Sequence, residues 1–343
     1  MGTIVAEYYG NRTDTESLIY PMHVEKDKAK RKELVREGEI PPCPFTNKSP
    51  CTKILKGNEP VCSVRKSDGT LWITCPDRLC STGKTENFLC KHQKDILLQV
   101  GRYIFSPKVS YEDICVKREE RLSVVEGTTY NADFIISLRT GSSSFSGPDR
   151  LVLEMQGGGE TTNTGDMTGK IQLWSNEFWH DSDVESSLIP DDCTQISNDP
   201  EKIKYYNGKL RQNTAASTLE TNAWRRQQEQ FIVKGNIAMK TWKGYGIAFC
   251  VGTLLYDYLM EKLASANLPN LKNYNWTLAI ITFKEDLSKP KEFGPIPLIV
   301  DESRLLYTNY QTFVQALINQ GEPSLDAFRG QFLTLNDQYV DIE

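Results

Sequence analysis

Six of the nine cysteines crowd into residues 43–90, and no other feature of the chain constrains its fold as strongly. They are Cys43, Cys51, Cys62, Cys75, Cys80 and Cys90. An odd total, without an apolar signal segment, argues against a disulfide framework. Thiolates can instead enclose a tetrahedral metal ion, whose binding supplies folding free energy that a small core lacks. This stretch therefore predicts a closed, structural metal site.

The first four cysteines of the cluster are the predicted ligands. Cys43, Cys51, Cys62 and Cys75 are separated by seven, ten and twelve residues, which is wider than the tight pairs of a zinc ribbon. The two later cysteines compete for a ligand position. Zinc and iron both accept four thiolates, so the composition leaves the metal open. The alternative is a group of ordinary core thiols, because free cysteine is often buried.

Composition and charge bound the class of protein. With 39% hydrophobic and 25% charged residues, the chain resembles an ordinary globular protein. No apolar run approaches the ~18 residues of a membrane helix, so we expect a cytoplasmic protein without membrane partners. The net charge of −5 weighs against nucleic-acid binding. Basic residues are nevertheless dense at 26–36 and 117–121, either as a binding surface or as solvated helix faces.

Two units are expected along the chain. Residues 1–94 read as a charged helix and the cysteine-rich module, and residues 95–343 as a larger domain with an irregular insertion at about 180–215. Strands are predicted at residues 71–73, 131–139, 150–156, 245–251, 275–283 and 297–300. Helices are predicted at 24–37, 95–104, 111–122, 219–234, 254–265, 311–319 and 324–333. The alternation of strands and helices indicates the α/β class.

Two of the predicted strands, residues 131–139 and 150–156, carry the candidate chemistry. Apolar residues alternate along both, which predicts one core-facing layer. Its members are Phe134, Ile136, Leu138, Leu151, Leu153 and Met155. The opposite face then carries Asp133 on the first strand and Glu154 with Gln156 on the second.

A hairpin symmetric about residues 140–149 places Gln156 opposite Asp133, with Glu154 diagonal to it at roughly 7–8 Å. Oxygens so placed can hold Mg²⁺, which would polarise a phosphate and activate water. The simpler alternative is a solvated outer face, which is common in antiparallel sheets. Asp149 forms a Pro-Asp dipeptide but lies in the turn, too close to Glu154 to face it, and we reject it as a ligand.

A further acid is expected upstream. The charged segment 111–122 is predicted to be a helix that aims one carboxylate at the metal. Glu119 is the preferred residue, with Glu120 and Glu126 as alternatives. The alternative is that Glu119 is an ordinary exposed surface residue.

Two sets of motifs resemble one known family. Cys43-Pro-Phe, Cys51, Cys62-Ser-Val and Cys75-Pro-x-Arg are similar to the cysteine module of NotI-type restriction endonucleases. Asp133, Leu153-Glu154-Met155-Gln156 and Thr168-Gly169 are similar to the active-site strands of that family. The two halves occur in the same order, and the resemblance covers roughly residues 40–250.

The resemblance implies a PD-(D/E)xK nuclease fold, with a mixed central sheet flanked by helices, in which Gln156 replaces the usual Lys. It implies Mg²⁺ at Asp133 and Glu154, Glu119 as a less secure upstream acid, and structural iron on the four cysteines. It also implies a homodimer that cuts a palindromic, often GC-rich site in double-stranded DNA, with a cognate DNA methyltransferase as functional partner. Because Gln is neutral, such a site would depend more on its metal ions.

The chain departs from the family pattern in two places. The run Gly157-Gly158-Gly159-Glu160 is unusually rich in glycine, and the insertion at 180–215 is unfamiliar. Both bear on target recognition, so the target sequence of the family is not transferred to this chain.

The predicted helix 219–234 is the best candidate for reading DNA. It carries Arg225, Arg226, Gln227 and Lys234, and Arg and Gln suit guanine and adenine edges. Apolar residues recur along the same helix at helical spacing, so core packing or a dimer seam is the alternative.

Three functions remain. The first is a type II restriction endonuclease that hydrolyses DNA phosphodiester bonds with Mg²⁺. The second is a less specific nuclease of DNA repair or defence with the same fold. The third is a non-catalytic DNA-binding protein built around the cysteine-bound metal.

Overall fold

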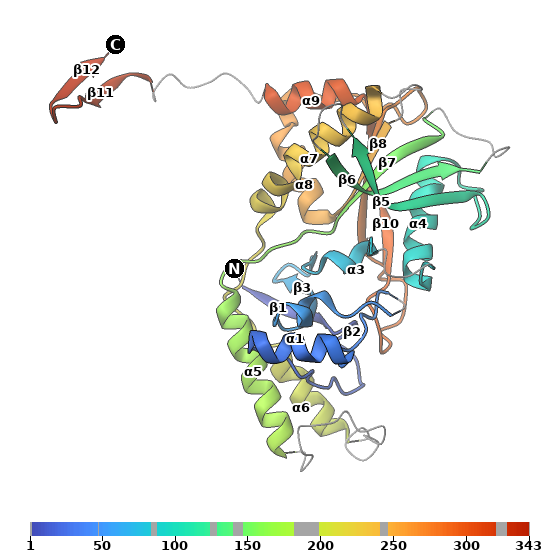
Figure 1. Ribbon diagram of the computed structural model, residues 1–343, viewed down its shortest axis with the longest axis vertical. Helices are drawn as coiled ribbons and strands as arrows, with labels where there is room; N and C mark the ends of the chain where they lie inside the picture. The colour runs from blue at the N-terminus through green and yellow to red at the C-terminus, as the bar shows by residue number, and fades with distance from the viewer. Residues whose placement is uncertain are drawn as a thin grey trace.

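A six-stranded mixed sheet forms the centre of the molecule in the computed structural model (Figure 1). Its order is β10-β9-β8-β7-β6-β5, with bounds β5 (Ile114–Ser123), β6 (Thr129–Leu138), β7 (Arg150–Gln156), β8 (Gly246–Gly252), β9 (Leu278–Glu285) and β10 (Leu298–Thr308). β8 is parallel to β7 and β9, and the other neighbouring pairs are antiparallel. The structure describes residues 2–46, 48–83, 88–123, 129–139, 147–181, 199–240, 246–319 and 328–342.

Helices cover both faces of this sheet. They are α4 (Lys91–Ile104) on one face and α7 (Glu220–Lys240), α8 (Thr253–Lys262) and α9 (Tyr310–Ile318) on the other. On β8, Ile247 and Phe249 join the core of the second face, while Ala248 and Cys250 join that of the first. A parallel strand inside a sheet is buried on both sides, so β8 is apolar throughout.

A smaller antiparallel sheet occupies the N-terminal part of the chain. Its order is β2-β1-β3-β4, with β1 (Thr3–Tyr8), β2 (Asn11–Arg12), β3 (Val61–Lys66) and β4 (Leu71–Ile73). The helices of this part are α1 (Lys28–Glu37), α2 (Thr52–Leu55) and α3 (Pro76–Cys80). A fully buried ion pair joins Arg78 Nε on α3 to Glu7 Oε2 on β1 at 2.7 Å. Arg78 also donates to the carbonyl of Ile296, which ties the smaller sheet to the larger unit.

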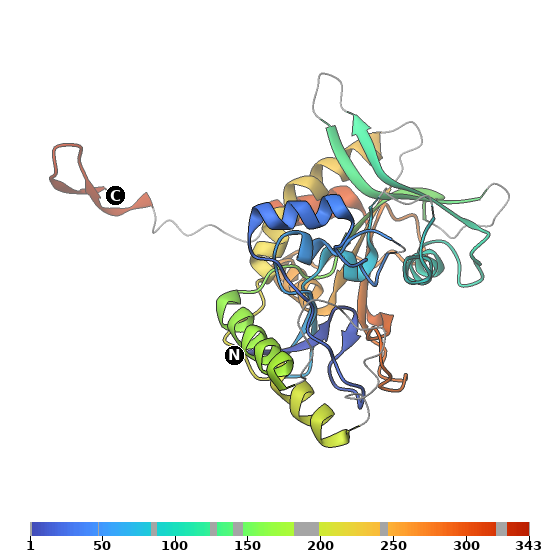
Figure 2. The ribbon, with the colours of Figure 1, turned by 60° about the horizontal axis from the view of Figure 1, so that its bottom comes forward.

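Two helices and a hairpin complete the molecule. Helices α5 (Thr164–Asp181) and α6 (Pro200–Leu210) lie side by side at one end (Figures 1 and 2). Strands β11 (Gly330–Leu333) and β12 (Tyr339–Ile342) form a hairpin that stands away from the body in both views. Within the described ranges, no helix combines the length and apolar composition needed to cross a membrane.

The glycine run after β7 is explained by the contact between the two sheets. A Cβ atom on Gly157 would lie 2.6 Å from Ile73 Cγ2, and one on Gly158 would lie 2.7 Å from Trp72 Cδ2. The backbone N–H of Gly159, which has a φ of 100°, donates to the carbonyl of Ile73 at 2.8 Å. Only glycine permits this close approach to β4, so the run serves the joint between the sheets.

Much of the predicted element pattern is confirmed. The α/β class and the mixed sheet flanked by helices are observed. Strands β4, β6, β7, β8, β9 and β10 and helices α1, α4, α7, α8 and α9 overlap the predicted segments. The predicted core layer on β6 and β7 is also observed, with Phe134 and Leu153 at 0% exposure. The division at residue 94 stays a prediction.

Other predictions were wrong. The predicted helix over 111–122 is replaced by edge strand β5 (Ile114–Ser123), on which Ile114 and Val116 pack inward. Many charged residues suggested a helix, but edge strands also carry charge.

Strand β1 was not predicted. Part of the expected insertion is helix α6, while residues 182–198 fall outside the described residues. The expected helix over 324–333 has strand β11 at its end, and residues 320–327 fall outside the described chain.

We predict that Gly158→Ala destabilises the protein by about 1–3 kcal/mol, because the added methyl group would overlap buried Trp72. Urea unfolding followed by tryptophan fluorescence measures the change. Gly169→Ala is the matched control, because nothing lies within 4 Å of its Cβ position on helix α5. That variant should be neutral or stabilised by up to about 1 kcal/mol. Equal effects of both substitutions would contradict the proposed role of the glycine run.

Candidate active site

Asp133 and Glu154 face one another across strands β6 and β7. The ladder pairs Phe134 with Leu153, and this register continued by one residue places Asp133 opposite Glu154. The expected hairpin register, with Gln156 opposite Asp133, is therefore wrong by two residues. A shift of two keeps every side chain on its face, so the carboxylates still share one side of the sheet.

The two carboxylates also interrupt the backbone ladder. The backbone N–H of Met155 donates to Asp133 Oδ2 at 2.8 Å, and the N–H of Asp133 points to Glu154 Oε1 at 3.4 Å. The regular pairing between β6 and β7 ends at Phe134 and Leu153. Side-chain oxygens thus take the place of ladder carbonyls, which holds both carboxylates rigidly against the strands.

Lys234 on helix α7 completes this group. Its Nζ donates to Glu154 Oε2 at 2.7 Å, and the Lys234 and Glu154 side chains are only 2% and 4% exposed. This burial argues against the predicted contact between Lys234 and DNA. Lys234 lies three residues after buried Phe231, and that spacing places it on the core face of the helix. The same spacing in the sequence was the available signal for this residue.

The charges of Asp133 and Glu154 favour the binding of a cation. Burial raises the pKa of Glu154 to about 8, and repulsion from Asp133 adds to the effect, while Lys234 lowers it. Burial also raises the pKa of Asp133, against the opposing effects of the Met155 N–H and Lys234. One lysine thus offsets only part of the cost of placing buried Glu154 beside half-buried Asp133. A divalent cation favours carboxylate oxygens and would offset the remainder.

Glu119 lies on the other side of Asp133. The β5–β6 ladder pairs Arg118 with Phe134 and Glu120 with Ala132, so Glu119 falls opposite Asp133. It has a φ of 45°, accepts a hydrogen bond from Thr82 Oγ1, and helps to raise the pKa of Asp133.

Glu119 thus approaches the carboxylate pair from strand β5, and not from the helix that was expected there. Of the alternatives, Glu120 lies 3.8 Å from Lys117, and Glu126 falls outside the described residues. Among the residues that the structure describes, no group of three or more His, Cys, Asp or Glu side chains has the arrangement of a metal site.

Gln156 lies in the wall of a neighbouring cleft of about 640 Å³. Its Oε1 accepts from Gln227 Nε2 at 3.0 Å, and its Nε2 donates to the Gly158 carbonyl at 3.3 Å. The cleft is also lined by Lys53, Lys56 and Glu59 from the N-terminal part of the chain, Glu160 from the glycine-rich loop, Thr164 and Met167 on α5, and Arg226 on α7. It therefore lies between the two sheets, directly beyond the end of β7.

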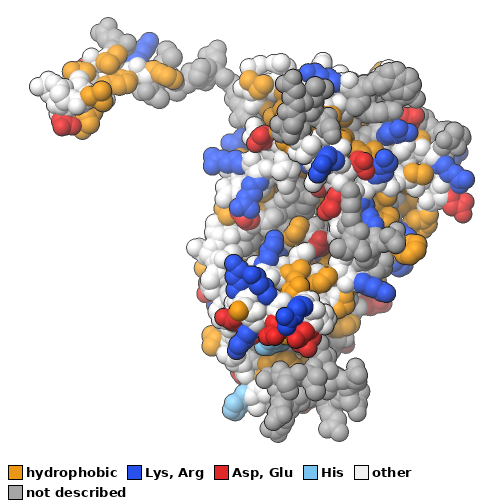
Figure 3. Space-filling view, in the orientation of Figure 1, with side chains coloured by type: hydrophobic (Ala, Val, Ile, Leu, Met, Phe, Trp, Pro, Cys, Tyr) orange, Lys and Arg blue, Asp and Glu red, His pale blue; other side chains and the backbone are white. Residues whose placement is uncertain are grey.

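The charge around the cleft is mixed. Lys53, Lys56 and Arg226 line it together with Glu59 and Glu160, and Arg226 Nη1 lies 2.5 Å from Glu160 Oε1. Lys and Arg side chains are interspersed with acidic ones over the coloured part of the face in Figure 3. Arg225 and Arg226 are exposed and Gln227 is half-buried, so these three candidates for DNA contact remain accessible to a ligand.

The four predicted cysteine ligands share one buried cluster. Cys43, Cys51, Cys62 and Cys75 are each 3–4% exposed and belong to a single small core. Backbone N–H groups point at every sulfur; the donors are Phe45 for Cys43, Lys53 and Ile54 for Cys51, Gly10 for Cys62 and Asp77 for Cys75. Such bonds stabilise thiolates, which are the form that binds metal. Burial raises the pKa of the Cys75 thiol to about 11.

The two competing cysteines lie elsewhere. Cys80 packs in the core beneath helix α4. Cys90 caps that helix and its Sγ donates to the carbonyl of Phe45. This arrangement favours the first four cysteines as a set.

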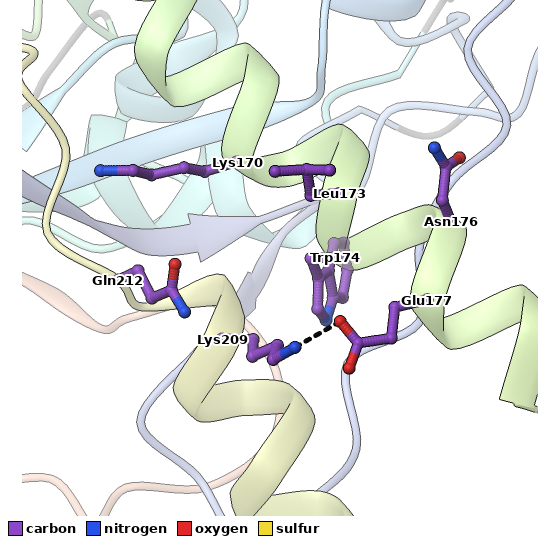
Figure 4. Close-up of a pocket in the computed structure, with 7 residues that line it drawn as sticks. All are labelled: Lys170, Leu173, Trp174, Asn176, Glu177, Lys209 and Gln212. Atoms are coloured by element: carbon purple, nitrogen blue, oxygen red, sulfur yellow. Dashed lines mark hydrogen bonds and ion pairs between the residues drawn. The ribbon is translucent and has the colours of Figure 1, made fainter.

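A separate cavity of about 460 Å³ lies between helices α5 and α6 (Figure 4). It is lined by Lys170, Leu173, Trp174, Asn176, Glu177, Lys209 and Gln212. Its two lysines are already paired with carboxylates, Lys209 with Glu177 and Lys170 with Asp166. We assign it no part in the site.

No protein-family model matches the chain, and no curated protein matches its sequence. Function is therefore inferred from the residues and contacts described above.

We predict that the metal-free protein loses stability as the pH rises from about 4.5 to about 8. Because the pKa of Glu154 is raised from 4.5 to about 8 on folding, the folded chain keeps a proton that the unfolded chain has released. The free energy of unfolding then falls by at most about 1.4 kcal/mol per pH unit within this window. Urea unfolding at several pH values measures the slope. Glu154→Gln removes this contribution, and an unchanged slope in that variant would contradict the assignment.

Proposed function

We propose that this protein is a Mg²⁺-dependent endonuclease that hydrolyses phosphodiester bonds in double-stranded DNA. The observation that carries the proposal is the carboxylate pair on adjacent strands, in which half-buried Asp133 lies beside Glu154, itself buried with Lys234. Two neighbouring carboxylates with one lysine, which pairs with Glu154, form a site of excess negative charge, and such oxygens favour hard divalent cations.

The residues have distinct roles in this proposal. Asp133 and Glu154 would hold the metal ion, and Glu119 would add a third carboxylate from β5. Bound there, Mg²⁺ supplies Lewis-acid polarisation of the phosphate and a more acidic water. Gln156 hydrogen-bonds to Gln227 and the glycine-rich loop, so it would shape the wall of the cleft by which the substrate enters.

DNA would enter by the cleft beside Gln156. Lys53 and Lys56 on one wall and Arg226 on the other suit a phosphate backbone, and Arg225 and Gln227 lie on the same helix. The pairing of Arg226 with Glu160 would open when a phosphate replaces the carboxylate. The resemblance to NotI-type enzymes supports a site-specific, homodimeric restriction endonuclease with a palindromic, GC-rich target and a partner methyltransferase.

The cysteine cluster is proposed to bind one structural iron or zinc ion. Its four thiols lie in one small core and accept hydrogen bonds from backbone N–H groups. Four cysteine sulfurs are a ligand set that either metal accepts. The cluster lies beside the cleft, since Cys75 and Lys53 line the same wall. The metal would thus stabilise the surface that carries the proposed DNA contacts.

We predict that the protein cuts plasmid DNA into discrete fragments when Mg²⁺ is present. Asp133→Asn and Glu154→Gln keep shape but remove charge, and each should slow cleavage by about 100-fold or more. Gel electrophoresis of timed digests measures the rates. Asp149→Asn is the matched control, because Asp149 is an exposed turn residue, and it should cut normally.

Other outcomes of the same digest decide between the alternatives. A smear of products would indicate a nuclease of low specificity. DNA binding without cleavage would indicate a non-catalytic protein with a cysteine-bound metal. Undiminished cleavage by Asp133→Asn would contradict the proposed site.

We predict that the purified protein contains about one iron or zinc ion per chain. Cys62→Ser should remove the ion and lower the melting temperature, because metal binding contributes to folding. Elemental analysis and thermal unfolding measure the two effects. Cys115→Ser is the control, because Cys115 is exposed on β5, and it should keep its metal. Full metal content in Cys62→Ser would contradict the ligand assignment.

A further inference from the structure

Lys234 is out of place on its helix unless it has a role in the site. The other buried side chains of α7 are Ala223, Trp224, Phe231, Gly235 and Ala238, all apolar or lacking a side chain. A buried charge is costly, and an apolar side chain of similar volume commonly serves stability as well or better. Packing alone therefore does not account for a lysine at this position.

The contacts of Lys234 hold Glu154 from the helix side. Its Nζ binds Glu154 Oε2 at 2.7 Å, while Glu154 Oε1 lies 3.4 Å from the backbone nitrogen of Asp133. The carboxylate is thus clamped between helix α7 and strand β6. This clamp sets the orientation of Glu154 relative to Asp133.

The ammonium group of Lys234 can also donate further hydrogen bonds. It carries three N–H donors, and in the part of the chain that the structure describes Glu154 is its hydrogen-bond acceptor. Gln156 is not equivalent, because it is neutral and its amide already bonds to Gln227 and Gly158. Lys234 is thus a positive charge in direct contact with Glu154.

We propose that Lys234 is the positioning residue of the active site, which orients Glu154 beside Asp133 and supplies the fixed positive charge that the Gln156 position lacks. This inference rests on the proposed nuclease function. Lys234 lies on helix α7, whereas Glu154 lies on strand β7. Helix α7 also carries Arg226 and Gln227 on the cleft, about 10–12 Å from Lys234 towards the N-terminus of the same helix.

The test compares Lys234→Met with Lys234→Arg. Met keeps the length of the side chain without charge, and it should slow single-turnover cleavage at saturating Mg²⁺ by about 100-fold. Affinity for a DNA fragment in Ca²⁺ should stay within about threefold, because Lys234 is buried away from the cleft. Lys234→Arg should recover at least about a tenth of the native rate, because it restores the charge. Lys240→Met, on an exposed position of α7, is the control and should match the native protein.

A second measurement does not require cleavage. Binding of Mn²⁺ to the protein alone, followed by electron paramagnetic resonance, should become about tenfold tighter in Lys234→Met, because a repelling charge beside Glu154 is gone. A structural defect would instead weaken Mn²⁺ and DNA binding together, and that result would overturn the inference. So would a cleavage rate within threefold of the native value.

The two proposals fail in different ways. If the native protein binds Mn²⁺ but cuts no DNA, the proposed function fails and the Mn²⁺ comparison still tests Lys234. If Lys234→Met does not fold, the double variant Lys234→Met with Glu154→Gln replaces both charges and should fold. Lys234→Arg then carries the kinetic test, and a rate below about a hundredth of native in that folded variant would overturn the inference.

Discussion

The buried contact between Lys234 and Glu154 is the interaction on which the rest of the candidate site depends. It joins the long helix α7 to the central strand β7, and it partly offsets the charge of Glu154 and Asp133. Without the lysine, buried Glu154 would lie beside half-buried Asp133 with no positive charge in direct contact. The excess negative charge that remains is the reason we propose a divalent cation there.

The joint between the two sheets places this site beside the cysteine cluster. Gly157 and Gly158 let the chain after β7 lie directly on Ile73 and Trp72 of β4. Cys75 follows that strand by two residues and lines the same cleft as Gln156. The glycine run at first resembled a departure in the recognition region, but its observed contacts are those of close packing.

The candidate site was partly predictable because strand patterning depends on parity. Alternating apolar residues on β6 and β7 placed Asp133, Glu154 and Gln156 on one face, and an error of two residues in register left that face unchanged. Glu119 was predicted as the upstream acid because it precedes β6. It was expected on a helix, but it lies on strand β5. Its place opposite Asp133 depends on the β5–β6 ladder, which sequence patterning does not reveal.

The sequence by itself determined the α/β class, most element positions, the clustering of cysteines and the shared face of the carboxylates. These follow from local periodicity, which the residues specify directly. Only the tertiary structure decided that Lys234 meets Glu154, because the two residues are 80 positions apart and come together through helix packing. The same holds for the four thiols gathered in one core and for the glycines pressed against β4. Contacts across such distances depend on register and packing angle, which local patterns leave open.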